Sequence, residues 1–325
     1  RFNSHISIQD GGLPLQGEPG EITDQGIDLK PMAAGYCFVR VDLFKQWSGD
    51  ADTGVFSITA HNETTFPKMT VGLSLNDQKL ARNGDALWFQ VPVQAGKKVF
   101  ALMKKDDRFY SHISMKEGGL PPEGDSGDVA DQGVYLKGQE AGYCYVRIGL
   151  YQEWSGNPDT GSFSVIAHDE STFPKIMVGE TLTEQQMNRY GEVRWYQVPV
   201  KAGGKTFVLL DKDSLFFSRI SILEGGLPGT GDYGTSTDQA VTMEAVSDGY
   251  CYVRLELYKT WSGDPDQGVF DIKAYDENTF PTLAPGDTIT DQALKFQGDR
   301  IWYQLNFDTP AAFFVDVMKH DNVWE

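Results

Sequence analysis

The chain has 325 residues, and its 46 acidic and 28 basic side chains give a formal net charge of −18 at pH 7. This charge argues against nucleic acids and anionic membrane surfaces as partners, because both recruit Lys and Arg. No apolar run approaches the ~20 residues of a membrane span, so none is predicted. A hydrophobic content of 40% is enough for a packed core, and the length predicts two domains or three small ones.

One unit recurs along the sequence every 107 residues. The hexapeptide Gly-Tyr-Cys-Phe-Val-Arg at 35–40 returns as Gly-Tyr-Cys-Tyr-Val-Arg at 142–147 and 249–254. The same step separates Trp88, Trp195 and Trp302. A period of this length is too long for a solenoid and suits tandem small domains, so we expect three repeats of about 107 residues.

Taken in chain order, each unit shows the period-2 alternation of β-strands. Residues 37–43 place Cys, Val and Leu on one face, and residues 55–60 follow across a Gly/Asp-rich turn, which predicts a hairpin. Residues 87–93 and 99–103 predict a second strand pair, whereas residues 76–82 are the one candidate for a helical turn. Further strands are predicted at 112–115 and 134–137. Six or seven short strands in ~100 residues predict an all-β fold, an antiparallel β-sandwich.

The order of these strands carries a family resemblance. An aromatic strand (Trp195, Tyr196, Val198) is followed by a Gly turn and an apolar strand, then by a Tyr-x-Tyr-Val strand and a Gly-Val-Phe last strand. This order resembles the bacterial pre-peptidase C-terminal (PPC) domain, a jelly-roll-like β-sandwich often appended to secreted enzymes. The Trp-Ser-Gly-Asp loop before the last strand departs from that pattern. The resemblance implies an extracellular location and a unit that begins ahead of the Trp-Tyr strand.

That phasing places the domain boundaries in polar stretches that end in Phe-Pro. It predicts complete β-sandwich repeats at 66–170 and 173–277, with the second half of a repeat at 1–63 and the first half of a repeat at 280–325. The other phasing starts a domain at residue 1 and ends it near residue 107.

Half a sandwich would expose unpaired strand edges and half a core. Three arrangements could cover these surfaces: a longer array of the same repeat, head-to-tail completion by other copies of the chain, or closure of both halves within one chain. We favour the first two equally. The residues expected at such an interface are Phe2, Ile6, Ile8, Trp302, Tyr303, Phe314, Val317 and Trp324.

Two groups of side chains are candidates for chemistry. The cysteines Cys37, Cys144 and Cys251 share the apolar strand face, so we expect them to pack in the core. The Asp-rich turns could hold Ca²⁺ through oxygen ligands, although tight hairpin loops have the same composition. The candidate calcium ligands are Asp50, Asp52, Asp159, Asp264 and Asp266.

The opposite strand face is aromatic. A stripe of this kind could stack on sugar rings, pack a neighbouring unit or lie against the second sheet. Its members are Tyr143, Tyr145, Trp154, Tyr250, Tyr252 and Trp261. Histidine does not support catalysis, since His112 becomes Arg219 and His168 becomes Tyr275 one repeat later.

The sequence therefore predicts a structural subunit or segment of an extracellular filament, stalk or adhesin. We expect no enzymatic activity and no cofactor apart from candidate Ca²⁺, with other copies of the chain as the main partner and glycans as a further candidate. The alternative is a tandem carbohydrate- or protein-binding module of a secreted enzyme.

Overall fold

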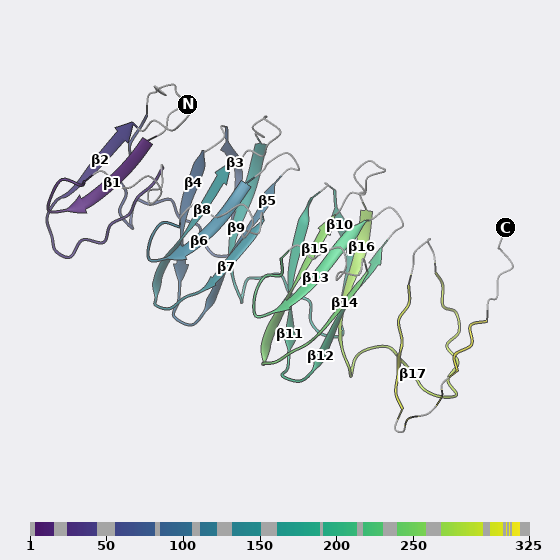
Figure 1. Cartoon of the computed structure of the whole chain (residues 1–325). Helices are drawn as coiled ribbons and strands as arrows, with labels where there is room; N and C mark the ends of the chain where they lie inside the picture. The colour runs from purple at the N-terminus through teal and green to yellow at the C-terminus, as the bar shows by residue number, and fades with distance from the viewer. Residues whose placement is uncertain are drawn as a thin grey trace.

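The computed structural model is an all-β protein drawn in Figure 1. It describes residues 4–15, 25–43, 56–81, 85–105, 111–121, 132–150, 161–188, 191–212, 217–229, 239–257, 268–294, 300–307, 310, 312 and 314–318. Within these ranges every regular element is a strand, which confirms the predicted fold class.

Seven antiparallel strands form the unit that we call sandwich 1. Its four-stranded sheet has the order β3-β9-β5-β7 and its three-stranded sheet has the order β4-β8-β6. The strands are β3 (Ser74–Leu80), β4 (Ala86–Val93), β5 (Lys98–Lys105), β6 (Ser111–Glu117), β7 (Gly133–Lys137), β8 (Gly142–Leu150) and β9 (Gly161–Asp169).

The next seven strands repeat this arrangement and form sandwich 2. Its sheets have the orders β10-β16-β12-β14 and β11-β15-β13. The strands are β10 (Thr181–Met187), β11 (Val193–Val200), β12 (Lys205–Lys212), β13 (Ser218–Glu224), β14 (Ala240–Glu244), β15 (Gly249–Leu257) and β16 (Gly268–Asp276).

Consecutive strands always lie in different sheets of a sandwich. The hairpin predicted from 37–43 and 55–60 is wrong, because residues 56–60 form no strand. The counterparts one repeat later do not pair either: β8 pairs with β4 and β6, whereas β9 pairs with β3 and β5. The same holds for β4 and β5, because the turn at 94–97 carries the chain from one sheet to the other. Period-2 alternation fixes which side chains face the core, but it does not fix which strands pair.

The candidate helical turn at 76–82 is also wrong, because residues 74–80 form the edge strand β3. A register shift between Leu75 and Gln78 interrupts its pairing with β9, and Asp77 there has a φ of 54°. Glu184 and Asp291 have φ values of 53° and 60° one and two repeats later. The interruption of the period-2 pattern at this bulge made the segment resemble a turn.

The cysteine face of β8 and β15 lies in the core, as the alternation predicts. Cys144 and Cys251 are fully buried, each inside the hydrophobic cluster that fills its own sandwich. Burial raises the pKa of both thiols to about 12. Both are therefore packing residues and not reactive thiolates.

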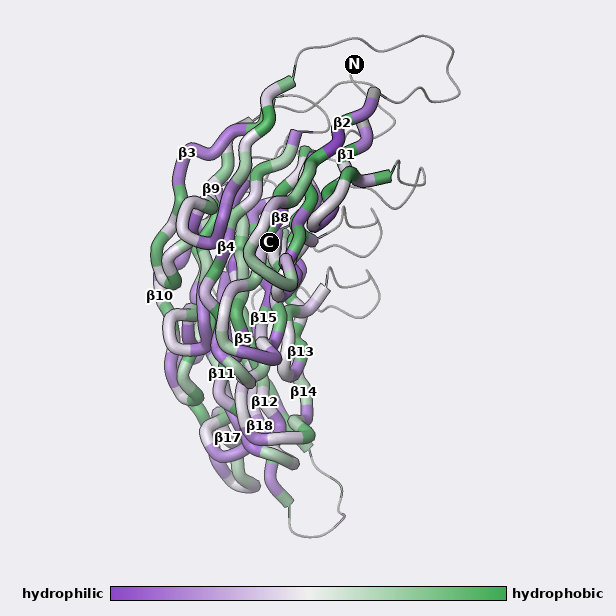
Figure 2. Tube along the Cα trace, turned by 90° about the vertical axis from the view of Figure 1, so that its left-hand side faces the viewer, coloured by the Kyte–Doolittle hydropathy of each residue, from purple (hydrophilic) through white to green (hydrophobic). Residues whose placement is uncertain are grey.

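Both ends of the chain repeat parts of this architecture. The strands β1 (Ser4–Asp10) and β2 (Cys37–Leu43) pair with the register of β6–β8 and β13–β15. At the other end, β17 (Thr282–Leu283) and β18 (Gln304–Leu305) form a short parallel pair. In the views of Figures 1 and 2 the parts follow one another along a single direction in chain order.

The N-terminal part lacks the covering that the sandwiches have. Cys37 is exposed, unlike its counterparts Cys144 and Cys251. Residues 56–60 were expected to be strand, but they form none and expose Phe56 and Ile58. Their counterpart β9 is held between β3 and β5, and no described strand takes those two places here.

The burial of the cysteines predicts a labelling stoichiometry. In a solution too dilute for self-association, we expect a thiol reagent such as a maleimide to modify Cys37 of the folded chain at once and to spare Cys144 and Cys251. Full denaturation should then release the other two thiols. Mass spectrometry of quenched reactions measures this, and immediate modification of all three cysteines would contradict the described cores.

Candidate functional site

The feature that recurs most consistently is the contact between successive units, which we call a junction. In the central junction, the outer face of the four-stranded sheet of sandwich 1 meets the three-stranded sheet of sandwich 2. The buried side chains between them form a third hydrophobic cluster, separate from the two sandwich cores. Its buried members are Phe100, Leu102, Phe173, Trp195, Leu227 and Tyr252.

A phenylalanine from the connecting segment is wedged into this contact. The Phe173 side chain is only 2% exposed. Its ring centroid lies 4.7 Å from that of Phe100 in sandwich 1 and 5.3 Å from that of Tyr252 in sandwich 2. Phe100 and Tyr252 also contact each other directly at 5.0 Å. Three mutually packed aromatic rings therefore join the two sandwiches.

Polar groups close the edge of this aromatic contact. The hydroxyl of Tyr252 donates to Oε1 of Glu170 at 3.3 Å, and the Lys98 Nζ lies 3.5 Å from the same oxygen. The Lys98 Nζ also lies 5.4 Å from the centroid of the Tyr252 ring. Burial, together with the nearby charge of Glu170, raises the pKa of Tyr252. Lys98, Glu170 and Tyr252 thus tie β5, the connecting segment and β15 together.

A second ionic contact crosses the junction at Glu192. Its side chain is only 3% exposed, and its Oε1 lies 2.9 Å from Arg194 Nη2 and 3.5 Å from Lys104 Nζ of sandwich 1. The other carboxylate oxygen accepts the backbone N–H of Asn188 at 3.0 Å. A buried carboxylate needs such partners, and one of the three, Lys104, comes from sandwich 1.

Two glycines allow the sheets to approach this closely. A Cβ at Gly133 would lie 3.0 Å from the Trp195 ring and 3.2 Å from Leu227. At Gly226 a Cβ would overlap the phenol of Tyr135, so the absence of a side chain makes room for that ring.

The connecting segment itself is a hydrogen-bonded turn. Asp169 Oδ1 accepts the backbone N–H groups of Ser171 and Thr172, and the backbone N–H of Asp169 donates to Thr172 Oγ1. Burial would raise the pKa of Asp169, but the hydrogen bonds from Ser171 and Thr172 outweigh it and lower that pKa. Asn62 and Asp276 accept equivalent bonds in their own segments. A turn of this kind limits the freedom of the units that it connects.

A phenylalanine also packs against a sandwich at each of the other two connections. Phe66 packs 5.4 Å from His61 and 5.2 Å from Tyr145 of sandwich 1. Phe280 packs 4.7 Å from Phe207 and 5.4 Å from Tyr275 of sandwich 2. Together with Phe173, these residues stand at the same point of the repeat, and we call them the linker phenylalanines.

The predicted aromatic stripe needs a correction at Tyr252, which is fully buried inside the central junction and not on the surface. Tyr145 is half-buried against Phe66. Tyr143 and Tyr250 are half-buried beside the ammonium groups of Lys68 and Lys175. For Tyr252 the stripe packs a neighbouring unit, which was one of the alternatives. Trp154 and Trp261 lie outside the described residues.

The predicted interface residues are divided between the two ends of the chain. Ile6 and Ile8 are half-buried on β1. Trp302 is 42% exposed, whereas its counterpart Trp195 is 6% exposed. Tyr303 is half-buried, and Phe314 and Val317 are exposed. Phe2 and Trp324 lie outside the described residues.

The candidate calcium ligands Asp50, Asp52, Asp159, Asp264 and Asp266 also lie outside the described residues. Within the described part of the chain, no group of three or more His, Cys, Asp or Glu side chains is placed to hold a metal ion. No helix of that same part is long and apolar enough to cross a membrane.

The composition of the connecting segments predicts polar linkers, and no role was predicted for the linker phenylalanines. The signal was present, since Phe66, Phe173 and Phe280 recur at the same 107-residue step as the core cysteines. A large apolar residue retained in every polar linker indicates a contact that buries it.

The central junction should weaken in mild acid because of His168. Its ring lies 5.6 Å from Phe173, and burial lowers the pKa of His168 below its ordinary value of 6.5, although Thr172 and Asp169 oppose the shift. The stability that depends on the neutral ring is present above pH 6.5 and is lost as the pH falls through the lowered pKa. One proton changes stability by at most ~1.4 kcal/mol per pH unit.

The chain offers a matched control, because Tyr275 occupies the position of His168 in sandwich 2. We expect His168→Tyr to remove part of the loss in melting temperature between pH 7.5 and 5. Differential scanning calorimetry at a series of pH values measures the difference. If the melting temperatures of the unmodified chain and of His168→Tyr fell equally with pH, a role for His168 would be contradicted.

Comparisons with known proteins show no family for this chain. No family model and no curated protein matches the sequence. Among solved structures, the CUB1-EGF-CUB2 domains of rat MASP-1 match 63% of this chain and 99% of their own at 7% identity, with a TM-score of 0.20. A Paenibacillus xanthan lyase matches 73% of this chain and 28% of its own at 9% identity, with a TM-score of 0.21. Similarities this weak carry no argument about function.

Proposed function

We propose that this chain is a structural segment of an extracellular filament, stalk or adhesin, in which stacked β-sandwiches act as a stiff rod. The observation that carries the proposal is the burial of Phe173 between two sandwiches that each have a core of their own. Beads on a flexible tether would leave the linker residue in water. A linker residue buried between two sandwiches would limit the angle between them, which is the property that a load-bearing rod needs.

Two further features support a rod. In the connecting turns, the side chains of Asp169 and Asp276 accept backbone N–H groups of the same turn, which restricts the conformations of the linkers. The net charge of −18 favours solubility of an elongated surface and opposes unspecific association. We also propose that the protein is extracellular, that its repeats are related to PPC domains and that it has no catalytic activity.

Electron microscopy of the native material tests the proposal. Antibodies against the chain, coupled to gold, should decorate thin, regularly segmented fibres or stalks at the cell surface. Labelling of discrete, unsegmented particles inside cells would overturn it.

A further inference from the structure

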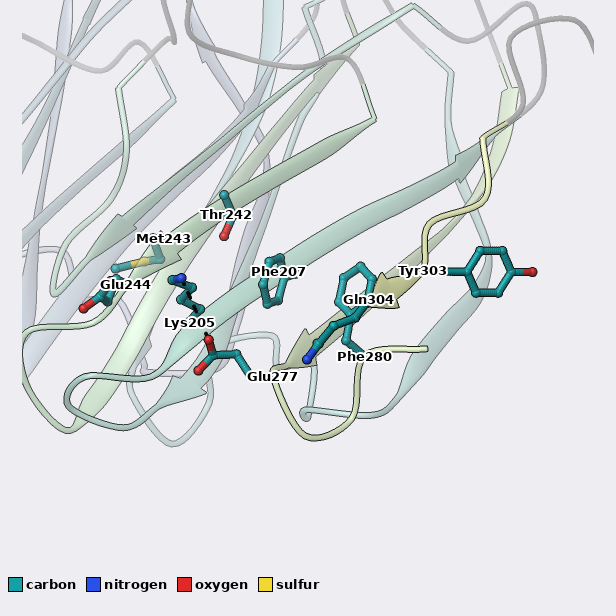
Figure 3. A pocket seen from close by; sticks show the side chains of 9 residues that line it. All are labelled: Lys205, Phe207, Thr242, Met243, Glu244, Glu277, Phe280, Tyr303 and Gln304. Atoms are coloured by element: carbon teal, nitrogen blue, oxygen red, sulfur yellow. Dashed lines mark ion pairs between the residues drawn. The ribbon is translucent and has the colours of Figure 1, made fainter. Parts of the chain in front are cut away.

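An apolar pocket lies at the end of sandwich 2, on the sheet face that corresponds to the junction face of sandwich 1. Its volume is about 650 Å³, and Figure 3 shows the side chains that line it. These are Lys205, Phe207, Thr242, Met243, Glu244, Glu277, Phe280, Tyr303 and Gln304. We call this pocket the socket.

The central junction shows what fills the equivalent place. There Tyr252 contacts Lys98, Phe100, Glu170 and Phe173. The residues 107 positions after those four are Lys205, Phe207, Glu277 and Phe280, and all four line the socket. The Phe207–Phe280 ring distance equals that of Phe100–Phe173, at 4.7 Å. The socket is therefore a preformed seat for an aromatic side chain at the Tyr252 position of a following unit.

The residue of this chain that stands at the Tyr252 position and is exposed is Phe38. It lies on β2, two repeats before Tyr252 and one before Tyr145, and is 41% exposed. The β1–β2 pair already has the register of β13–β15, with Gln9 opposite Phe38 as Leu223 is opposite Tyr252. The β1–β2 pair therefore corresponds to β13 and β15, which are two of the three strands that sandwich 2 contributes to the central junction.

The C-terminal part contains the counterpart of the third strand, of which Gln304–Leu305 (β18) is strand in the structure. Residues 300–307 correspond to β11, which pairs with β15 through Trp195 opposite Arg254 and Gln197 opposite Tyr252. The same register would place Gln304 opposite Phe38, Trp302 opposite Arg40 and Leu305 opposite Cys37. Arg254 and Arg147 lie over the rings of Trp195 and Trp88 at 5.7 and 5.5 Å, so the exposed Trp302 offers the same contact to Arg40.

The exposure of the two ends is complementary. Val208 and Leu210 of β12 are 0% and 5% exposed, whereas their counterparts Val315 and Val317 are 58% and 81% exposed. Cys37 is exposed while its two counterparts are buried. Each end therefore leaves in water the apolar surface that the other end would cover.

We propose that the socket binds the β1–β2 strand pair of a second copy of this chain, with Phe38 seated between Phe207 and Phe280. The inference rests on the proposed function, because it names the partner that would extend the rod. Phe38 lacks the hydroxyl that Tyr252 gives to Glu170. The ion pair of the socket, Lys205–Glu277 at 3.9 Å, corresponds to Lys98–Glu170 at 3.5 Å in the central junction. Repetition of the contact is head to tail and does not close on itself, so it produces a filament.

Disulfide cross-linking of the full chain tests whether the partner is a second copy. Leu305→Cys places a thiol opposite Cys37 of the second copy, so mild oxidation should give a ladder of covalent multimers on a non-reducing gel. Asn306→Cys is the matched control, because neighbouring strand residues point to opposite faces and the new thiol would point away. Adding Cys37→Ser to Leu305→Cys should abolish the ladder. Salt of at least ~0.15 M should be present to screen the like charges of the copies.

Association without cross-linking gives a second measurement. In analytical ultracentrifugation, Phe38→Ala should weaken self-association about tenfold or more, as for a central interface aromatic. Phe38→Tyr should preserve it, since tyrosine occupies this position in both later repeats. Met32→Ala, at a 97% exposed residue, should change nothing.

Equal ladders from Leu305→Cys and Asn306→Cys, or no ladder at any protein concentration, would overturn the proposal. Its failure is distinguishable from failure of the rod, because stiffness is measured within one chain. A stiff chain that forms no ladder would keep the rod and assign the socket to another occupant, such as a following repeat on a longer polypeptide.

Discussion

Phe173→Ala is expected to uncouple the two sandwiches while leaving both cores intact. Phe173 belongs to the junction cluster and to neither sandwich core, so its removal leaves a cavity beside the direct contact of Phe100 with Tyr252. Truncation of a buried phenylalanine to alanine costs about 3–5 kcal/mol. We expect most of this loss to appear as lost coupling between the sandwiches and little as loss of stability within either one.

Calorimetry of the full chain measures the coupling. The variant should replace a coupled unfolding transition by two separate ones. Phe217→Ala is the control, because Phe217 lies in sandwich 2 but is 40% exposed and outside the junction cluster. A Phe173→Ala profile that coincides with that of the unmodified chain would contradict the junction.

Phe163→Ala is expected to destabilise sandwich 1 by about 3–5 kcal/mol. Phe163 is 2% exposed on β9 and packs in the cluster that also contains Cys144. Opening of sandwich 1 should therefore expose Cys144 before Cys251. The two thiols act as internal reporters of the two cores.

Thiol labelling in mild denaturant, followed by mass spectrometry of the cysteine peptides, separates the two events. Phe270→Ala removes the counterpart of Phe163 and should reverse the order, exposing Cys251 first. Equal acceleration of both thiols in both variants would mean that the sandwiches do not hold independent cores.

Much of the fold could be predicted from the sequence because a strand with one buried face has an apolar residue at every second position. The sequence at 144–150 and 251–257 alternates strictly, and the Cys, Val, Ile and Leu residues of the cysteine face all pack in the sandwich cores. The 107-residue step could be read directly from identical segments. Neither inference required knowledge of which strands pair.

Strand pairing could not be predicted in the same way. The turns at 94–97 and 201–204 are short enough for a hairpin, yet each connects two different sheets. Chain proximity favoured local pairing, but burying the two apolar faces against each other placed consecutive strands in opposite layers. The pairing is decided by packing between sheets and not by the turn.

Only one side of the central junction could be predicted from the sequence. The alternation of the strand predicts an aromatic face of tyrosines, but it does not distinguish sugar stacking, packing of a neighbouring unit and packing against the second sheet. The decisive partner, Phe173, lies in a segment whose composition indicates a linker. A contact between units depends on surfaces that both units present, so no pattern within one strand reveals it.

If the two sandwiches stack through a fixed, buried contact, the distance between equivalent points on them should be constant. Spin labels at Gln139→Cys and Val246→Cys, in a Cys37→Ser background, measure that distance. Both labels occupy the same exposed position, one repeat apart, while Cys144 and Cys251 stay buried. We expect one narrow distance distribution that broadens when Phe173→Ala is added. A broad distribution in the chain that retains Phe173 would contradict a fixed contact.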